Sequence, residues 1–162
     1  MLEKTILSWN EGEEDFLLNV ASQYKIGGII IFGHNINDDL PDLLSKVRKT
    51  SKNDDLIICV DQEGGRVRRF KDEKTFLPAP GDVTSYQNPI QYEENVRYMA
   101  DELQKRGINT ILAPVVDLVV RKDNVLGDRS YGDIKEIGHY ATAFVAGCKA
   151  AGVETCLKHF FG

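Results

Sequence analysis

The sequence predicts an α/β protein in which helices cover a parallel β-sheet. Short, nearly continuous apolar segments alternate along the chain with segments whose apolar residues recur at helical spacing. Strands buried on both faces are apolar throughout, so this alternation is typical of repeated β–α–β units. Each clear apolar segment also ends at a polar or charged cluster. Two arrangements fit this pattern, a doubly wound open sheet and a (β/α)8 barrel.

Four segments predict amphipathic helices, because their apolar residues recur every three or four positions. They are residues 13–24, the segment with Leu40, Leu43, Leu44 and Val47, the segment with Val96, Met99, Ala100 and Leu103, and the segment with Ile137, Ala141, Phe144 and Cys148. Asp38 or Asp39 can cap the second helix and Asp133 the fourth, while Gly107 and Gly152 end the third and fourth.

Four apolar segments predict buried strands. They are residues 29–32, 56–60, 108–116 and 153–157. No clear strand is indicated within residues 1–7. A complete (β/α)8 barrel takes about 250 residues, and this chain has 162, so its length argues against a complete barrel.

Composition indicates a single globular domain with an acidic balance. Hydrophobic residues make up 42% and charged residues 28% of the chain, and the net charge is −5. That charge argues against nucleic acid or an anionic membrane surface as the main partner. The basic run of residues 46–52 is explained by a solvated helix face, whereas the run from Arg66 to Lys71 calls for a closer examination.

The cysteines and the hydropathy pattern indicate a cytosolic protein. Cys59, Cys148 and Cys156 stand among apolar neighbours without CxxC spacing, so we expect buried, reduced thiols. The start of the chain has no long apolar segment of the kind that secretion signals carry, and no run of about 18 apolar residues occurs. We therefore expect a soluble, cytoplasmic protein with no membrane partner.

Polar clusters at the strand ends predict the site. They are His34-Asn35, Asp61 with Glu63, Asp117, and Lys158-His159. Parallel strands point the same way, so these groups should converge on one rim together with the loop of residues 127–132. The sequence contains neither GxGxxG nor GxxxxGK[ST], which argues against dinucleotides and nucleotides. Carboxylates that accept from hydroxyls and cations that donate to them suit a neutral polyhydroxyl ligand.

Five motifs in order resemble the N-terminal barrel domain of glycoside hydrolase family 3. They are Gly-Gly-Ile-Ile-Ile-Phe-Gly-His-Asn-Ile at 27–36, Val-Asp-Gln-Glu-Gly-Gly-Arg-Val at 60–67, Gly-Ile-Asn at 107–109 with Ala-Pro-Val-Val-Asp at 113–117, Asp-Arg-Ser-Tyr-Gly at 128–132, and Lys-His-Phe-Phe-Gly at 158–162. The bacterial β-N-acetylglucosaminidase branch, which acts in cell-wall recycling, is the most similar.

The resemblance implies a TIM-type barrel, an N-acetylglucosaminide substrate, a retaining mechanism and no metal or organic cofactor. The family's sugar-binding residues match five positions of this chain, so the resemblance implies that these five bind sugar. They are Asp61, Arg69, Arg129, Lys158 and His159. We expect roughly the N-terminal half of a barrel, incomplete at its C-terminus and also at its N-terminus.

The resemblance also implies where the catalytic residues lie. The family motif has proline where this chain has Phe161, and after the position of Gly162 it continues into Gly-His-Gly. The family's acid/base histidine and nucleophilic aspartate lie downstream of that motif. We therefore expect no catalytic residue within 1–162, and we expect both members of the pair downstream of Gly162.

Several charged residues have a structural interpretation beside the functional one. We expect Asp61 and Glu63 to point to opposite faces, which would exclude them as a catalytic pair. Glu63 is then a salt-bridge partner of an arginine, and Arg66 and Arg68 form ion pairs at the rim. For Asp117, a loop cap and a ligand contact remain equally open.

Three hypotheses stay open from the sequence. The first is a β-N-acetylhexosaminidase-like hydrolase whose catalytic residues lie outside this chain. The second is a non-catalytic sugar-binding remnant, or a half-barrel that pairs with another copy or with a complementing C-terminal half, because open strand edges and uncovered apolar faces favour association. The third is a doubly wound domain that binds a small metabolite.

Overall fold

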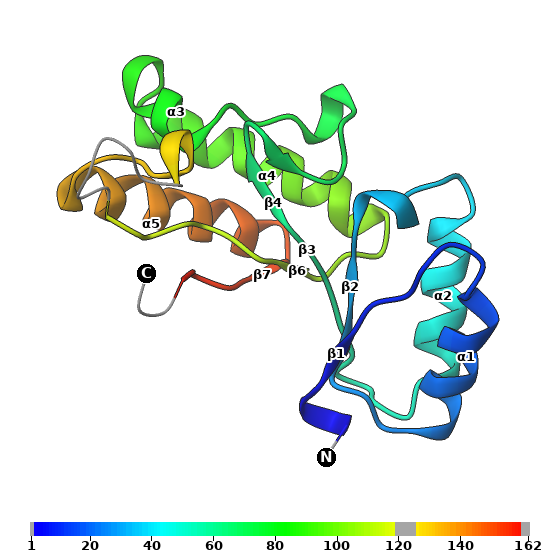
Figure 1. The fold of residues 1–162 in the computed structure, drawn as a ribbon. Helices are drawn as coiled ribbons and strands as arrows, with labels where there is room; N and C mark the ends of the chain where they lie inside the picture. Colours follow the sequence, from blue (N-terminus) through cyan, green and yellow to red (C-terminus); the bar gives the residue numbers. More distant parts are fainter. Residues whose placement is uncertain (1, 119–125, 160–162) are drawn as a thin grey trace.

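A computed structural model of the protein describes residues 2–118 and 126–159 (Figure 1). Its centre is a five-stranded sheet in the order β1-β2-β3-β6-β7, and all neighbouring strands are parallel. The strands are β1 (Ile6–Leu7), β2 (Gly28–Ile31), β3 (Ile57–Val60), β6 (Thr110–Ile111) and β7 (Glu154–Thr155). A separate antiparallel hairpin, β4 (Gln62–Gly64) with β5 (Val67–Arg68), follows β3.

The strand order decides between the two predicted arrangements. A doubly wound sheet reverses its strand order at a switch point, whereas the strands of a (β/α)8 barrel follow one another around the sheet. Here the parallel strands follow chain order without a reversal. The partial TIM-type barrel is confirmed, and the doubly wound alternative is wrong.

The sheet has one strand more than the sequence indicated. Ile6 pairs with Gly28 and Leu7 with Ile29, so a parallel strand exists where we expected none. At two residues, β1 is too short to show a strand pattern in the sequence.

The described part of the chain contains five α-helices, which lie against the sheet. They are α1 (Glu14–Gln23), α2 (Leu40–Thr50), α3 (Pro80–Tyr86), α4 (Pro89–Lys105) and α5 (Ile134–Ala150). Figure 1 shows α1 beside α2 next to β1 and β2, and α4 running along α5 on the other side. As predicted, Asp133 caps α5, accepting from the backbone N–H groups of Lys135 at 2.8 Å and Glu136 at 2.9 Å.

The core lies between the sheet and these helices. Its fully buried side chains include Ile29, Ile58, Leu44, Met99 and Phe144. Cys59 and Cys148 are buried as expected, and burial raises the pKa of the Cys59 thiol to about 11. Cys156 is exposed, contrary to expectation. It directly follows β7, which is the edge strand of the sheet.

Candidate functional site

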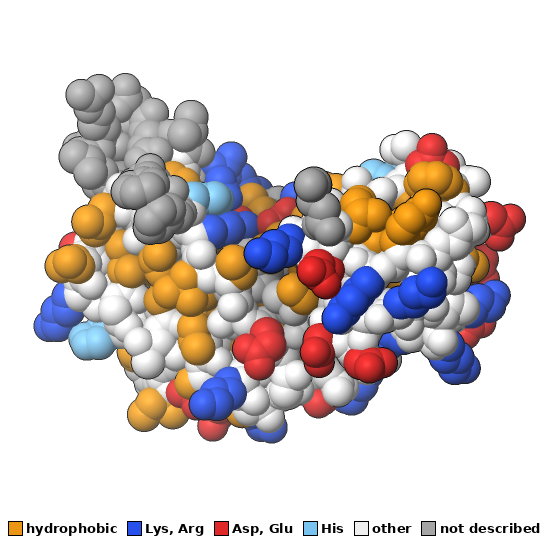
Figure 2. Space-filling view, turned by 90° about the horizontal axis from the view of Figure 1, so that it is seen from below, with side chains coloured by type: hydrophobic (Ala, Val, Ile, Leu, Met, Phe, Trp, Pro, Cys, Tyr) orange, Lys and Arg blue, Asp and Glu red, His pale blue; other side chains and the backbone are white. Residues whose placement is uncertain are grey.

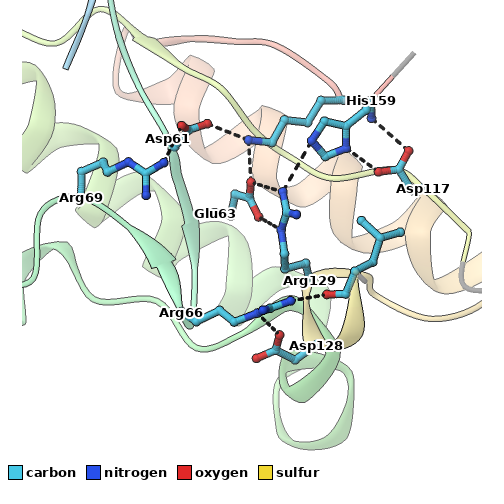
Figure 3. Close-up of polar contacts among 10 residues, drawn as sticks. Asp61, Glu63, Arg66, Arg69, Asp117, Asp128, Arg129 and His159 are labelled. Carbon is cyan, nitrogen blue, oxygen red and sulfur yellow. Dashed lines mark hydrogen bonds and ion pairs between the residues drawn. The ribbon is translucent and has the colours of Figure 1, made fainter. Parts of the chain in front are cut away.

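The polar side chains that follow β3, β6 and β7 meet at one edge of the sheet (Figure 3). Asp61 stands directly after β3, and Lys158 and His159 come shortly after β7. Arg129 reaches the same place from the 3-10 helix η4 (Gly127–Arg129), and Arg69 comes from the end of the β4–β5 hairpin. The structure thus brings together all five residues that the resemblance assigned to sugar binding.

Lys158 lies at the centre of this cluster. Its Nζ is 2.8 Å from Asp61 Oδ1 and 2.5 Å from Glu63 Oε1. The second oxygen of Asp61 accepts from Arg69 Nη2 at 2.9 Å. Asp61 therefore joins two cations, and each of its oxygens has a fixed donor.

Glu63 holds Arg129 through two parallel hydrogen bonds. Arg129 Nε donates to Glu63 Oε2 and Arg129 Nη2 to Oε1, both at 2.8 Å. The predicted salt-bridge role of Glu63 is confirmed. The expectation that Asp61 and Glu63 point to opposite faces is wrong, since both contact Lys158. Residues two apart on an extended chain share a face, and the hairpin continues the direction of β3 through Asp61.

Asp117 fixes the orientation of His159. One carboxylate oxygen lies 2.6 Å from His159 Nδ1, and the other accepts from the His159 backbone N–H at 3.0 Å. With Nδ1–H directed at the carboxylate, Nε2 is directed at Arg129 Nη2, 3.5 Å away. Of the two roles left open for Asp117, the structure shows a structural contact, to His159.

Exposure divides the cluster into two groups. The side chains of Glu63 and Asp117 are 1% and 3% exposed. Those of Lys158, Asp61, Arg129, Arg69 and His159 are accessible, from 14% to 45%. The two buried carboxylates hold accessible side chains in position. The five accessible side chains can themselves touch a ligand.

Gln62 is a supporting residue that the sequence did not reveal. Its buried Oε1 accepts from the backbone N–H groups of Arg69 at 2.9 Å and Phe70 at 3.2 Å, and its Nε2 donates to the carbonyls of Phe70 and Thr75. These bonds close the hairpin and place Arg69 beside Asp61. Only its place between Asp61 and Glu63 could have pointed to it.

The charges of the cluster favour ionised carboxylates. Burial opposes ionisation of Asp61, but the hydrogen bonds and charges of Lys158 and Arg69 outweigh it, so the pKa of Asp61 lies below its usual value. Burial likewise opposes ionisation of Asp117, and the contacts with His159 lower its pKa below the usual range. Neither carboxyl group is suited to donate a proton near neutral pH.

Other predicted residues lie around this cluster. Arg66 pairs with Asp128 at 2.9 Å, as expected, whereas Arg68 has no ion pair within the described part of the chain and lies over the ring of Phe76 instead. Trp9 is buried, as predicted for a packing residue.

The end of the last motif lies outside the described residues. This applies to the aromatic pair Phe160-Phe161, which we expected to pack, and to Gly162. The structure therefore does not test the expectation that the nucleophile and the acid/base residue follow Gly162. It stays a prediction.

Between residues 2 and 118 and from 126 to 159, no group of three or more His, Cys, Asp or Glu side chains could hold a metal ion. Within the same ranges, every helix is too short or too polar to cross a membrane.

Comparison with known proteins identifies the family. Residues 10–162 match the glycosyl hydrolase family 3 N-terminal domain. A β-hexosaminidase from Photobacterium profundum is 42% identical over 141 residues, which are 85% of this chain and 42% of that protein. Among solved structures, Mycobacterium tuberculosis LpqI superposes with a TM-score of 0.87 and is 30% identical in sequence. The matched region is 99% of this chain and 47% of the LpqI chain. NagZ from Neisseria gonorrhoeae has a TM-score of 0.80 and 31% identity, over 98% of this chain and 49% of its own.

The chain spans less than half the length of the curated relatives it matches. The match nevertheless extends over nearly all of its own residues and includes every part of the polar cluster. The chain therefore belongs to glycosyl hydrolase family 3, and its described fold is the N-terminal part of that family's barrel domain.

Proposed function

We propose that this chain forms the sugar-binding part of a β-N-acetylhexosaminidase-type glycoside hydrolase that acts on N-acetylglucosaminides. The relatives named β-hexosaminidase support the reaction class. A solved NagZ complex with N-trifluoroacetyl-D-glucosamine, 31% identical to this chain, supports the type of sugar.

The charge balance of the cluster carries the proposal. Three carboxylates, Asp61, Glu63 and Asp117, are paired with three cations, Arg69, Arg129 and Lys158, and with His159. The accessible members therefore offer strong donors and acceptors without an uncompensated charge, as a neutral sugar with several hydroxyl groups requires.

The same contacts argue that hydrolysis needs residues from outside this chain. A retaining glycosidase requires a nucleophile and an acid/base group on either side of the scissile bond. Glu63 is buried against two cations, Asp117 is bound to His159, and Asp61 is bound to Lys158 and Arg69. We therefore assign these three carboxylates to binding and support, and we place the catalytic pair in sequence that follows Gly162 in the relatives.

A cytoplasmic location, with a role in cell-wall recycling, remains part of the proposal. Cys59, Cys148 and Cys156 are all unpaired. Free thiols are typical of a reducing compartment.

An assay of hydrolysis tests the division of labour. The chain is incubated with 4-nitrophenyl N-acetyl-β-glucosaminide, alone and mixed with the C-terminal remainder of the Photobacterium profundum relative. We expect no release of nitrophenol by the chain alone and release by the mixture. In the mixture, Lys158→Met should abolish release, while Lys46→Met on the exposed face of α2 should not. Hydrolysis by the chain alone would contradict the proposal.

A further inference from the structure

A cleft adjoins the Asp61 end of the polar cluster, since Arg69 lines it and contacts Asp61. This cleft has a volume of about 630 Å³, and its lining includes Phe32, His34 and four cationic residues. The lining residues come from the segments after β1 and β2 and from the β4–β5 region. The cleft therefore opens at the same edge of the sheet as the sugar-binding residues, and its volume is within the range of small-molecule sites.

The charge of the cleft is unlike that of the whole chain. The protein carries a net charge of −5. The cations in the lining are Arg66, Arg68, Arg69 and Lys71, and the described residues contribute no aspartate or glutamate to it. These four residues belong to the basic run from Arg66 to Lys71. Cavities lined by charges of one sign concentrate counter-ions, so this cleft should attract anions.

Two of the four cations are compensated from outside the cleft. Arg69 is paired with Asp61 and Arg66 with Asp128. Neither Arg68 nor Lys71 has a salt bridge to any carboxylate among the described residues. The contact with the Phe76 ring, 5.0 Å from the guanidinium carbon, holds Arg68 in place. The cleft therefore keeps the charges of Arg68 and Lys71 available for a ligand.

Arg69 connects the cleft to the sugar-binding residues. Its Nη2 donates to Asp61, whose other oxygen accepts from Lys158 (Figure 3). Its guanidinium carbon lies 5.8 Å from the centre of the Phe32 ring, which also lines the cleft. The His34 ring stacks on Phe32 at 6.0 Å and is fixed by the Trp9 carbonyl. Arg69 therefore belongs both to the lining of the cleft and to the polar cluster.

We propose that the cleft binds an acidic group, carboxylate or phosphate, attached to the saccharide that the Asp61–Arg69 pair holds. Arg68 and Lys71 are its principal contacts, because Arg66 and Arg69 are already paired with carboxylates. The inference rests on the proposed function, because it takes the neighbouring cluster to be a sugar site. It adds a preference for acidic saccharides over neutral ones.

Calorimetric titrations of the chain test this preference with four probes. The probes are N-acetylglucosamine, N-acetylglucosamine 6-phosphate, N-acetylmuramic acid and inorganic phosphate. We expect at least one acidic sugar to bind about tenfold more tightly than N-acetylglucosamine at low ionic strength, as one charge-assisted contact would give. High salt should reduce this advantage.

Substitutions in the cleft locate the effect. Arg68→Gln/Lys71→Gln should remove the advantage of the acidic sugar and leave the affinity for N-acetylglucosamine unchanged. The control Lys46→Gln/Lys49→Gln removes two exposed charges from α2. This variant should still bind the acidic sugar more tightly than N-acetylglucosamine. Lys71 is exposed, so Lys71→Gln alone should fold normally even if the double variant does not. It should lower the affinity advantage of the acidic sugar severalfold.

The outcomes separate the two proposals. If N-acetylglucosamine binds and no acidic sugar binds more tightly, the cleft proposal fails and the sugar site stands. If inorganic phosphate alone binds as tightly as the acidic sugars, the link between the anion and the sugar is wrong. If an advantage persists in Arg68→Gln/Lys71→Gln, the anion binds elsewhere and the cleft proposal is wrong. If no sugar binds at all, the proposed function is wrong, and the cleft proposal that rests on it is wrong too.

Discussion

Asp117 shows how a buried carboxylate can fix the position of a neighbouring side chain. It uses one oxygen for the imidazole and the other for the backbone of the same residue, His159. Both the ring orientation and the backbone position of His159 therefore depend on it. Its own side chain is 3% exposed, so a ligand has little access to it.

Asp117→Asn should weaken sugar binding without removing any accessible group. An asparagine offers one acceptor oxygen, so one of the two bonds to His159 is lost. We expect about tenfold weaker binding of N-acetylglucosamine and a free energy of unfolding lower by about 1.5–3 kcal/mol. Nitrogen-15 NMR of the imidazole should show a changed tautomer signal.

Asp101→Asn is the matched control for that substitution, because Asp101 is 48% exposed and pairs with Lys105 on the surface. It should change neither the binding nor the imidazole spectrum. An unchanged tautomer signal in Asp117→Asn would show that Asp117 does not orient His159.

The lowered pKa values of Asp61 and Asp117 predict acid sensitivity. A carboxyl group whose pKa is lower in the folded state stabilises that state above its unfolded pKa, about 3.9, and loses this contribution as the pH falls through the folded pKa. Urea unfolding should therefore give a free energy that falls below about pH 4. Asp61→Asn should flatten this dependence, and an equally steep fall in the variant would contradict the assignment.

At the scale of elements, the packing of α4 against α5 depends on a glycine. A Cβ on Gly147 would lie 2.6 Å from the Glu93 carbonyl oxygen and 3.0 Å from Val96 Cβ. Gly147→Ala should lower the free energy of unfolding by about 1–3 kcal/mol, because the two backbones must move apart. Chemical denaturation measures it.

Gly138 provides the control on the same helix. Apart from the backbone of its own helix, no heavy atom of the described residues lies within 4 Å of a Cβ placed there, so Gly138→Ala should stabilise the protein by up to about 1 kcal/mol through helix propensity. Equal effects of the two substitutions would show that close approach of α4 is not what requires Gly147.

The length of an element decided whether the sequence could predict it. Helices α1, α2, α4 and α5 have 10 to 17 residues, enough for an apolar stripe to repeat. The seven-residue α3 and the short β1 carry no such repeat. The strand expected over residues 108–116 is regular only at Thr110–Ile111, and Pro114, which has no N–H, cannot extend the ladder as a donor.

For the site, the sequence predicted which residues lie on the rim better than it predicted their contacts. Placement at strand ends indicated Asp61, Lys158 and His159 on one rim, together with the loop that carries Arg129. The ligand role of Arg69 depended on the family resemblance. The contact network itself could not be read from the sequence. Gln62, for example, acts through four backbone bonds that form only when the hairpin closes.

For the whole molecule, uncovered apolar surface is the main consequence of a partial barrel. An apolar cavity of about 270 Å³ beside β1 and α1 includes Leu7, Phe16 and Tyr24 in its lining, and Phe16 is 64% exposed. Figure 2 shows hydrophobic side chains gathered in two areas of one face, with charged side chains between them. Surfaces of this kind favour association.

We expect the chain to self-associate through the region around β1 and α1. Light scattering coupled to size-exclusion chromatography should give a mass above 18.2 kDa that rises with concentration. Phe16→Glu/Tyr24→Lys should lower it, while Ile90→Glu, which replaces an exposed residue of α4, should not. A constant monomer mass would contradict this expectation.

The most direct test of the account is an NMR titration of the nitrogen-15-labelled chain with N-acetylglucosamine. If the polar cluster is a sugar site, Lys158→Met abolishes the shifts, and the largest amide shifts in the unaltered chain fall at Asp61, Arg69, Arg129, Lys158 and His159. Shifts concentrated elsewhere, or unchanged in that variant, would contradict the assignment of this cluster to carbohydrate binding.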